Sequence, residues 1–188
     1  MLLFAAIAED RPQQREVADS LLTGVAQGDQ KAFTELYRTA GKAIYAYALS
    51  ILKNPADAED VLQDTFLKIR SAAPLYKPMG KPMAWMMTIT RNLCLMKLRQ
   101  QKNLSFFPLE TLNEPSELDQ ITDFEDRLVL RTALQILSDV ECQIIVLHAV
   151  TGWKHREIAR QLGLPVSTVL SKYRRGLQKL KAELEGIL

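Results

Sequence analysis

The sequence has few of the residues that build catalytic and metal sites. Its 188 residues include two cysteines, Cys94 and Cys142, and two histidines, His148 and His155. The cysteines are far apart and form no Cys-x-x-Cys pair, so each is expected to be a structural thiol. On a helix His148 would stand nearly opposite Cys142, which gives no catalytic pair, and His155 is expected at the surface. No glycine-rich phosphate loop or nucleophile elbow is present. We therefore expect no catalytic residues, no metal and no other cofactor.

The sequence also lacks a long apolar run. A membrane-spanning helix needs about 20 successive apolar residues. The apolar opening of the chain, MLLFAAIAED, meets Glu9 and Asp10 early and has no basic residues before it, so it does not resemble a signal peptide. A content of 47% hydrophobic and 24% charged residues is typical of a folded soluble protein. We expect a cytoplasmic protein without membrane insertion.

Charge is unevenly distributed along the chain, although the formal net charge is only +2. Between Thr65 and Leu109 every charged residue is basic, and between Glu110 and Asp126 every charged residue is acidic. The basic block favours a surface that binds a polyanion, and the acidic block favours a tether that follows it.

Helical periodicity dominates the first half of the chain. Residues 1–14 show none and are expected to form a loose arm. Apolar spacing then predicts a helix from Val17 to near Gly28, a second from an Asp29 N-cap through Ile51, and a third over 57–71. The third helix should bury Val61, Leu62, Thr65, Phe66 and Ile69. After an irregular, proline-containing basic loop at 72–82, a helix over 83–101 should turn toward the core Trp85, Met86, Ile89, Leu93 and Met96.

The second half predicts a separate helical domain. Residues 103–123 contain Pro108 and Pro115 and little periodicity, and are expected to be a flexible linker. A helix is expected over 124–137, and Ser138 with Glu141 forms a capping box for the next one. The predicted fold class is therefore all-α, with one helical domain over 15–102 and another over 124–188.

The segment 151–177 has the pattern of two short helices joined by a tight turn. Gly163 ends the first helix, because glycine accepts the left-handed conformation, and Pro165 begins the second. One sector of the second helix is apolar. The opposite sector carries Ser167, Ser171, Arg174, Arg175 and Gln178, whose groups reach phosphates and base edges when a helix lies in a major groove. This pattern favours a DNA-binding helix-turn-helix, and a helical hairpin with a basic solvated face is the alternative.

The order of these segments resembles the extracytoplasmic-function (ECF) group of the sigma-70 family of bacterial RNA polymerase sigma factors. The resemblance depends on DAEDVLQDTF, WMMTITRNLCLMKLR, the acidic linker and LSDVECQIIVLHAVTGWKHREIARQLGLPVSTV, in that order. It implies that 15–102 is region 2, which binds core polymerase and opens the promoter −10 element. It also implies that 124–188 is region 4, which reads the −35 element. The implied partners are promoter DNA and core RNA polymerase, through the clamp helices of its largest subunit and its flap.

The resemblance also assigns residues. Those implied for core polymerase binding are Asp57, Asp60, Gln63 and Asp64, although acids at a helix N-terminus are stabilised by the macrodipole without any partner. Those implied for −10 DNA are Tyr76, Lys77, Lys81, Trp85, Arg91, Asn92, Lys97 and Arg99. Those implied for −35 DNA are Ser167, Thr168, Ser171, Lys172, Arg174 and Arg175. The alternative interpretation of Trp85 is that it is an ordinary core tryptophan. The loop at 77–82 departs from the family, so the identity of the base that it receives stays open. Leu170 departs as well, because the family often has Lys or Arg there, so one contact with DNA is expected to be missing.

Two other functions remain open. A free-standing helix-turn-helix transcriptional regulator would need neither the acidic helix nor the basic aromatic segment. A helical adaptor that binds only protein would leave the basic sector of the last helix unexplained. The chain is expected to be a monomer when free. An anti-sigma factor that holds it inactive is usual for the group and is left open as a further partner.

Overall fold

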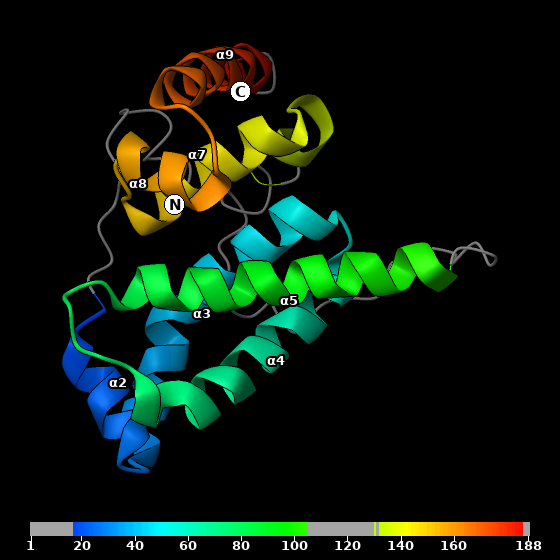
Figure 1. Cartoon of the computed structure of the whole chain (residues 1–188). Coiled ribbons are helices and arrows are strands. Elements are labelled where there is room, and N and C mark those ends of the chain that lie inside the picture. Colours follow the sequence, from blue (N-terminus) through cyan, green and yellow to red (C-terminus); the bar gives the residue numbers. More distant parts are fainter. Residues whose placement is uncertain (1–16, 105–129, 131, 186–188) are drawn as a thin grey trace. The chain divides into compact units, whose positions relative to one another are not determined.

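Helices form nearly all of the described structure. The computed structural model describes residues 17–104, 130 and 132–185, and within these ranges it contains no strand (Figure 1). The expected all-α class is thus confirmed. None of the described helices combines the length and apolar character needed to cross a bilayer. The expected arm at 1–14 and nearly all of the expected linker at 103–123 lie outside the described residues.

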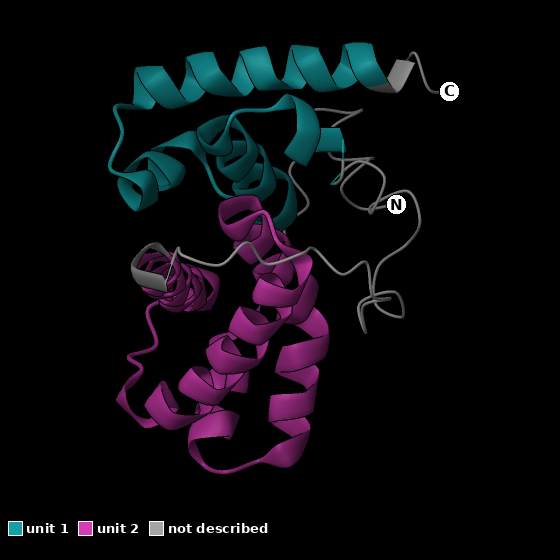
Figure 2. Cartoon of the chain, turned by 90° about the vertical axis from the view of Figure 1, so that its right-hand side faces the viewer, with its two compact units in different colours: residues 1–15, 118–188 teal, residues 16–117 magenta. Residues whose placement is uncertain are grey.

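The chain divides into two compact units, which are coloured separately in Figure 2. One comprises residues 16–117, and the other comprises residues 1–15 together with 118–188. The expectation of two helical domains is confirmed, and their expected boundaries stay predictions. Each unit is described by itself.

The first unit is a bundle of helices built around α3. Asp29 caps α3, since its Oδ1 accepts a hydrogen bond of 2.8 Å from the backbone N–H of Lys31. Asn54 caps α4 in the same way at 3.1 Å, through the N–H of Asp57, and Pro55 occupies the first helical position. The described elements are α2 (Asp19–Ala26), α3 (Gln30–Leu52), α4 (Pro55–Ala72), the 3-10 helix η1 (Ala73–Leu75) and α5 (Pro82–Leu104). The loop expected over 72–82 is therefore irregular only between η1 and α5.

The core of this unit confirms one predicted helix face and corrects another. The five apolar or hydroxyl residues predicted to face inward from α4 are all buried. On α5, Met86 is buried as expected, whereas Trp85, Ile89 and Leu93 are half-buried and Met96 is 49% exposed. The buried stripe of α5 instead contains Met83, Met86, Met87, Thr90 and Cys94. Apolar residues occur on several sides of α5, so helical periodicity alone wrongly placed Met96 in the buried sector.

Both cysteines are buried thiols, as expected. Burial raises the pKa of the Cys94 thiol to about 12, against smaller opposing effects from a backbone hydrogen bond and from Lys97. A thiol with so high a pKa carries little thiolate at neutral pH and reacts slowly.

The second unit contains α7 (Asp139–Thr151), α8 (His155–Leu162) and α9 (Val166–Glu185). The Ser138 capping box is confirmed, because the N–H of Glu141 donates to Ser138 Oγ at 3.4 Å and the N–H of Ser138 donates to Glu141 Oε2 at 3.1 Å. Of the helix expected over 124–137, residues 132–136 are helical, and 124–129 and 131 lie outside the described residues.

Helices α7 and α9 approach each other closely. A Cβ atom on Gly176 of α9 would lie 2.8 Å from Ile145 Cδ1 and 3.4 Å from Glu141 Cβ, both on α7. Glu141 is only 4% exposed, and its Oε2 accepts a hydrogen bond of 3.0 Å from Lys179 Nζ on α9. Burial alone would raise the pKa of Glu141, but the hydrogen bonds from Lys179 and Ser138 outweigh it and the pKa is lowered.

The close approach of α2 to α3 gives a first prediction. A Cβ atom on Gly24 would lie 2.7 Å from Ala32 Cβ, which cannot move without its helix, so Gly24→Ala should destabilise the protein by about 1–2 kcal/mol. Gly41→Ala is the matched control. Its new Cβ would lie 3.9 Å from the Tyr37 ring, and the helix gains about 0.5–1 kcal/mol. Urea unfolding should shift in opposite directions for the two variants, and equal shifts would contradict this packing.

The buried carboxylate gives a second prediction. Because folding lowers the pKa of Glu141, its stabilising effect is complete above the ordinary value of 4.5 and is lost as the pH falls through the lower folded value. Glu141→Gln should therefore destabilise the protein by about 1–2 kcal/mol at pH 7. The difference from the wild type should shrink in the acid range. Urea unfolding of both proteins between neutral and acidic pH measures this, and a constant difference in stability would contradict it.

Candidate nucleic-acid and partner interfaces

The turn between α8 and α9 has the predicted geometry. Gly163 has a φ of +67°, and the backbone N–H of Leu164 donates to the carbonyl of Ala159 at 3.0 Å. Val169 N–H donates to the Pro165 carbonyl at 3.1 Å, so the first turn of α9 is formed immediately after the proline. Ile158 and Ala159 are buried beneath the turn. The two helices are therefore held as a helix-turn-helix.

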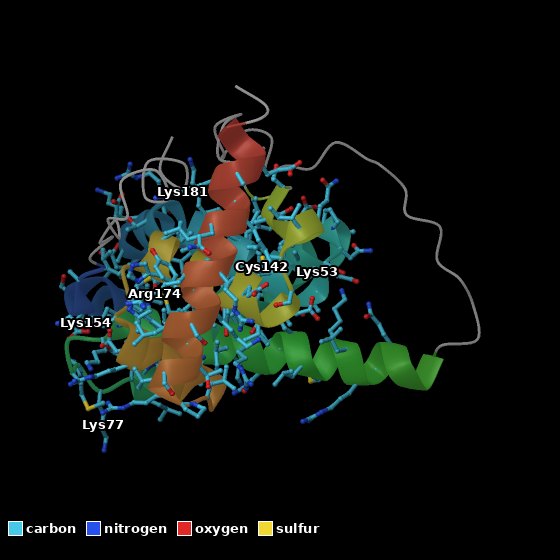
Figure 3. The ribbon with its side chains drawn as sticks, turned by 90° about the horizontal axis from the view of Figure 1, so that it is seen from above. Lys53, Lys77, Cys142, Lys154, Arg174 and Lys181 are labelled. Carbon is cyan, nitrogen blue, oxygen red and sulfur yellow. The ribbon has the colours of Figure 1, made fainter. Side chains whose placement is uncertain are left out.

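The outward face of α9 is basic and polar. Val169, Tyr173 and Leu180 are buried, which leaves the opposite side in solvent. Arg174 is labelled on this helix in Figure 3. The exposed residues there are Ser167, Ser171, Arg174, Arg175 and Gln178, as predicted, whereas Thr168 and Lys172 are half-buried. Two apolar residues are also exposed at the start of this helix, Val166 at 38%, which was not predicted, and Leu170 at 37%.

An aromatic cluster joins the three helices of this unit. The rings of His148, His155 and Tyr173 have pairwise centroid distances of 4.8 Å, and the two imidazoles are stacked at 25°. His148 Nδ1 donates to the carbonyl of Trp153 at 2.8 Å, since a carbonyl can only accept. The expectation that His155 is a surface residue is wrong. Its ring is half-buried because it packs against α7 and α9.

An ion-pair network joins α4 to α5. Lys97 Nζ lies 2.9 Å from Asp57 Oδ1 and 2.7 Å from Asp60 Oδ2, and Gln101 Nε2 donates to Asp57 Oδ2 at 2.7 Å. Burial alone would lower the pKa of Lys97, but its hydrogen bonds to Asp60 and Asp57 outweigh this effect and the pKa is raised. The network therefore joins two residues expected at the polymerase face to one expected at DNA.

The rest of the α4 face is open to solvent. Gln63 and Asp64 are exposed, and the Asp60 side chain is 67% exposed, whereas that of Asp57 is 20% exposed. A groove runs between this face and α5, and exposed Met96 is part of it. The groove is lined by Asp60, Val61, Gln63, Asp64, Leu93, Met96, Lys97 and Gln100.

The loop over 76–81 is held against α2. Tyr76 Oη donates to Asp19 Oδ1 at 2.5 Å, and the backbone N–H of Gly80 donates to Asp19 Oδ2 at 2.8 Å. The Tyr76 ring lies 5.0 Å from that of Trp85, and both rings are half-buried. Burial raises the pKa of Tyr76 to about 12, with help from Asp19. Trp85 is thus neither a full core residue nor a free surface ring.

The other residues expected at −10 DNA lie apart from Lys97. Lys77, Lys81, Asn92 and Arg99 are exposed, and Arg91 is half-buried. At about 100° per residue, Asn92 and Arg99 share one side of α5, and Lys97 lies more than 90° away. Lys77 is labelled in Figure 3, on the loop before α5. Asn92 and Arg99 therefore share a side of α5 that does not include Lys97, and the roles of all these residues stay predictions.

Comparison with known proteins matches both units. The family model for sigma-70 region 2 matches residues 36–104, and that for sigma-70 region 4 matches residues 127–180. The chain is 31% identical over 163 residues to the RNA polymerase sigma factor CarQ of Myxococcus xanthus, covering 86% of this chain and 93% of CarQ. It is 26% identical over 170 residues to the ECF RNA polymerase sigma factor SigK of Mycobacterium sp. (strain KMS), covering 87% of this chain and 88% of SigK.

A solved structure is similar as well. It is the structure of CnrH in complex with the cytosolic domain of CnrY, with 28% sequence identity and a TM-score of 0.59. The similarity covers 89% of this chain and 97% of that one.

The ion-pair network gives a third prediction. Lys97→Met keeps most of the side chain but leaves two neighbouring carboxylates without their cation, so the protein should lose about 1 kcal/mol of stability. Lys68→Met on α4 is the matched control, because Lys68 is exposed and lies outside the network. The urea midpoint should fall for the first variant alone. Equal midpoints would mean that the network contributes nothing to the pairing of α4 with α5.

Proposed function

The chain belongs to the sigma-70 family of RNA polymerase sigma factors, in its extracytoplasmic-function group, and from this we propose how its surfaces divide the work. Such a protein directs core RNA polymerase to promoters for transcription initiation. Residues 15–102 act as region 2 and residues 124–188 as region 4, with 103–123 as the linker between them. The observation that carries this division is the presence of an exposed acidic face and an exposed basic helix in different units.

We assign the −35 element to α9. Arg174 and Arg175 are exposed guanidiniums suited to phosphates and guanine edges, and the Ser167 and Ser171 hydroxyls can reach either. Half-buried Thr168 and Lys172 lie at the margin of this face. Exposed Leu170 stands where the family often has a cation, and its side chain suits contact with a thymine methyl group. A leucine in place of that cation changes the preferred DNA sequence as well as the number of contacts with DNA.

We assign core polymerase binding to the exposed part of the α4 face. Gln63, Asp64 and Asp60 would contact the clamp helices of the largest subunit, while Asp57 acts mainly inside its own unit through Lys97 and Gln101. The groove beside them offers apolar Met96 and Leu93 next to carboxylates. A partner helix that presents both basic and apolar side chains fits such a surface. Region 4 would contact the polymerase flap.

We assign the −10 element to the 76–81 loop and the adjacent face of α5. Lys77, Lys81, Arg91, Asn92 and Arg99 supply cations and hydrogen-bond donors for the backbone of a single strand. Removing a base from the stack costs a few kcal/mol, which stacking on an aromatic surface offsets, and the Tyr76–Trp85 pair provides one. We exclude Lys97 from this set because it faces Asp57 and Asp60.

The remaining properties follow from this function. We propose that the protein has no catalytic chemistry of its own, acts in the cytoplasm and is a monomer when free. The structure of CnrH is that of a complex with the cytosolic domain of CnrY. We propose that this chain likewise forms a complex with a partner protein, an anti-sigma factor. A free-standing helix-turn-helix regulator is disfavoured, because it would have no use for a region 2 unit.

Two substitutions test the division of work. Asp64→Ala should weaken binding to core polymerase and leave the binding of promoter DNA by an assembled complex unchanged. Arg175→Ala should leave core affinity unchanged and lower promoter occupancy by about tenfold, the effect of losing one good DNA contact. Each variant is the control for the other. Titration with labelled core polymerase and with promoter fragments measures both affinities, and variants that lose both together would contradict the assignment.

A further inference from the structure

One carboxylate in the first helix of region 2 binds two donors far along the chain. Asp19 stands in the first turn of α2, and its two oxygens accept separately from Tyr76 Oη at 2.5 Å and from the backbone N–H of Gly80 at 2.8 Å. Tyr76 and Gly80 lie near the two ends of the segment between η1 and α5. Asp19 therefore connects α2 to both ends of the loop.

A carboxylate suits this position for a simple reason. Each of its oxygens is an acceptor, so it can satisfy two donors that approach from different directions. An asparagine has one acceptor oxygen, so its NH₂ group would face either the Gly80 N–H, which cannot accept, or the Tyr76 hydroxyl, which would have to turn its proton away. Gly80 has a φ of +67°, a conformation that glycine adopts without strain, and the loop backbone thereby turns its N–H toward Asp19.

The contact determines what the loop presents to solvent. With its hydroxyl bound, the Tyr76 ring is held beside Trp85. The side chains of Leu75 and Met79 are then 82% and 76% exposed, and Lys77 is exposed between them. Exposed apolar side chains next to a cation can support an unstacked base and the phosphate that follows it.

We propose that Asp19 is a positioning residue that holds the 76–81 loop ready to receive the unpaired strand of the −10 element. This inference rests on the proposed function, in which the loop contacts that strand. Ordering a loop costs about 1–2 kcal/mol for each residue fixed. A loop that Asp19 has already ordered does not meet that cost when DNA binds, so the single strand binds more tightly.

The test uses the complete chain assembled with core polymerase. The DNA probes are a single-stranded non-template −10 oligonucleotide and a duplex −35 fragment, both taken from a promoter selected by the wild-type complex. Asp19→Asn should lower affinity for the single strand by about tenfold, the effect of one hydrogen bond to a charged group. It should change affinity for the −35 duplex by less than about twofold. Glu183→Gln, an exposed residue of α9, is the control for loss of one negative charge.

A second variant separates a positioning role from direct contact with DNA. Tyr76→Phe keeps the ring but removes the hydroxyl, so it should also weaken single-strand binding. Adding it to Asp19→Asn should cost little more, because both changes weaken the same attachment of the loop to α2. Amide hydrogen exchange should quicken at Gly80 in Asp19→Asn while the core amides of α3 stay protected.

Several results would overturn the proposal. These are unchanged single-strand affinity in Asp19→Asn, unchanged exchange at Gly80, or an equal loss on both DNA probes, which would indicate a general folding defect. Additive losses in the double variant would indicate that the hydroxyl contacts DNA itself. A wild-type complex without selective affinity for the −10 oligonucleotide would contradict the proposed function, and this inference with it. The wild-type complex alone is enough to detect that outcome, so it is tested before any variant is made.

Discussion

The ion pairs of Lys97 with Asp57 and Asp60 join α4 to α5, and both proposed contact surfaces of region 2 depend on that junction. The partly buried Lys97 side chain neutralises the acids nearest α5. Gln63 and Asp64 are left exposed as the proposed surface for a partner protein, and Arg91 and Arg99 lie on a different side of α5 from Lys97. A helix pair with opposite charges on its two outer sides can bind a protein and a nucleic acid at once.

The second unit uses charge in a similar way. Glu141 caps its own helix through Ser138 and also pairs with Lys179, so a single buried carboxylate fixes the start of α7 and the position of α9. Gly176 allows the two helices to approach closely on the same side. Gly176 and the buried Val169 and Leu180 lie on the side of α9 away from Arg174, whereas Lys179 is only about 40° around the helix from Arg175. Substitutions on the outward face can then alter promoter preference with little effect on packing.

Patterns between neighbouring residues were predicted well. The Asp29 cap, the Ser138–Glu141 box and the left-handed Gly163 each follow from residues within about one helical turn, and the outward sector of α9 follows from periodicity within one helix; the structure contains all of them. Contacts between distant residues were not predicted. The exposed Met96, the stacked His155 and the pairing of Lys97 depend on which helices meet, and helical periodicity carries no such information. The contact from Asp19 to Tyr76 left no local signal in the sequence.

The most direct test of this account is run-off transcription with purified bacterial core polymerase, with and without the protein, on a pool of promoter-sized DNA fragments. The account predicts transcripts with defined start sites that appear only when the protein is added, from fragments that share a −35 and a −10 sequence. Sequence-specific, salt-sensitive DNA binding by the protein alone, without any new transcript, would contradict it and would support a free-standing regulator.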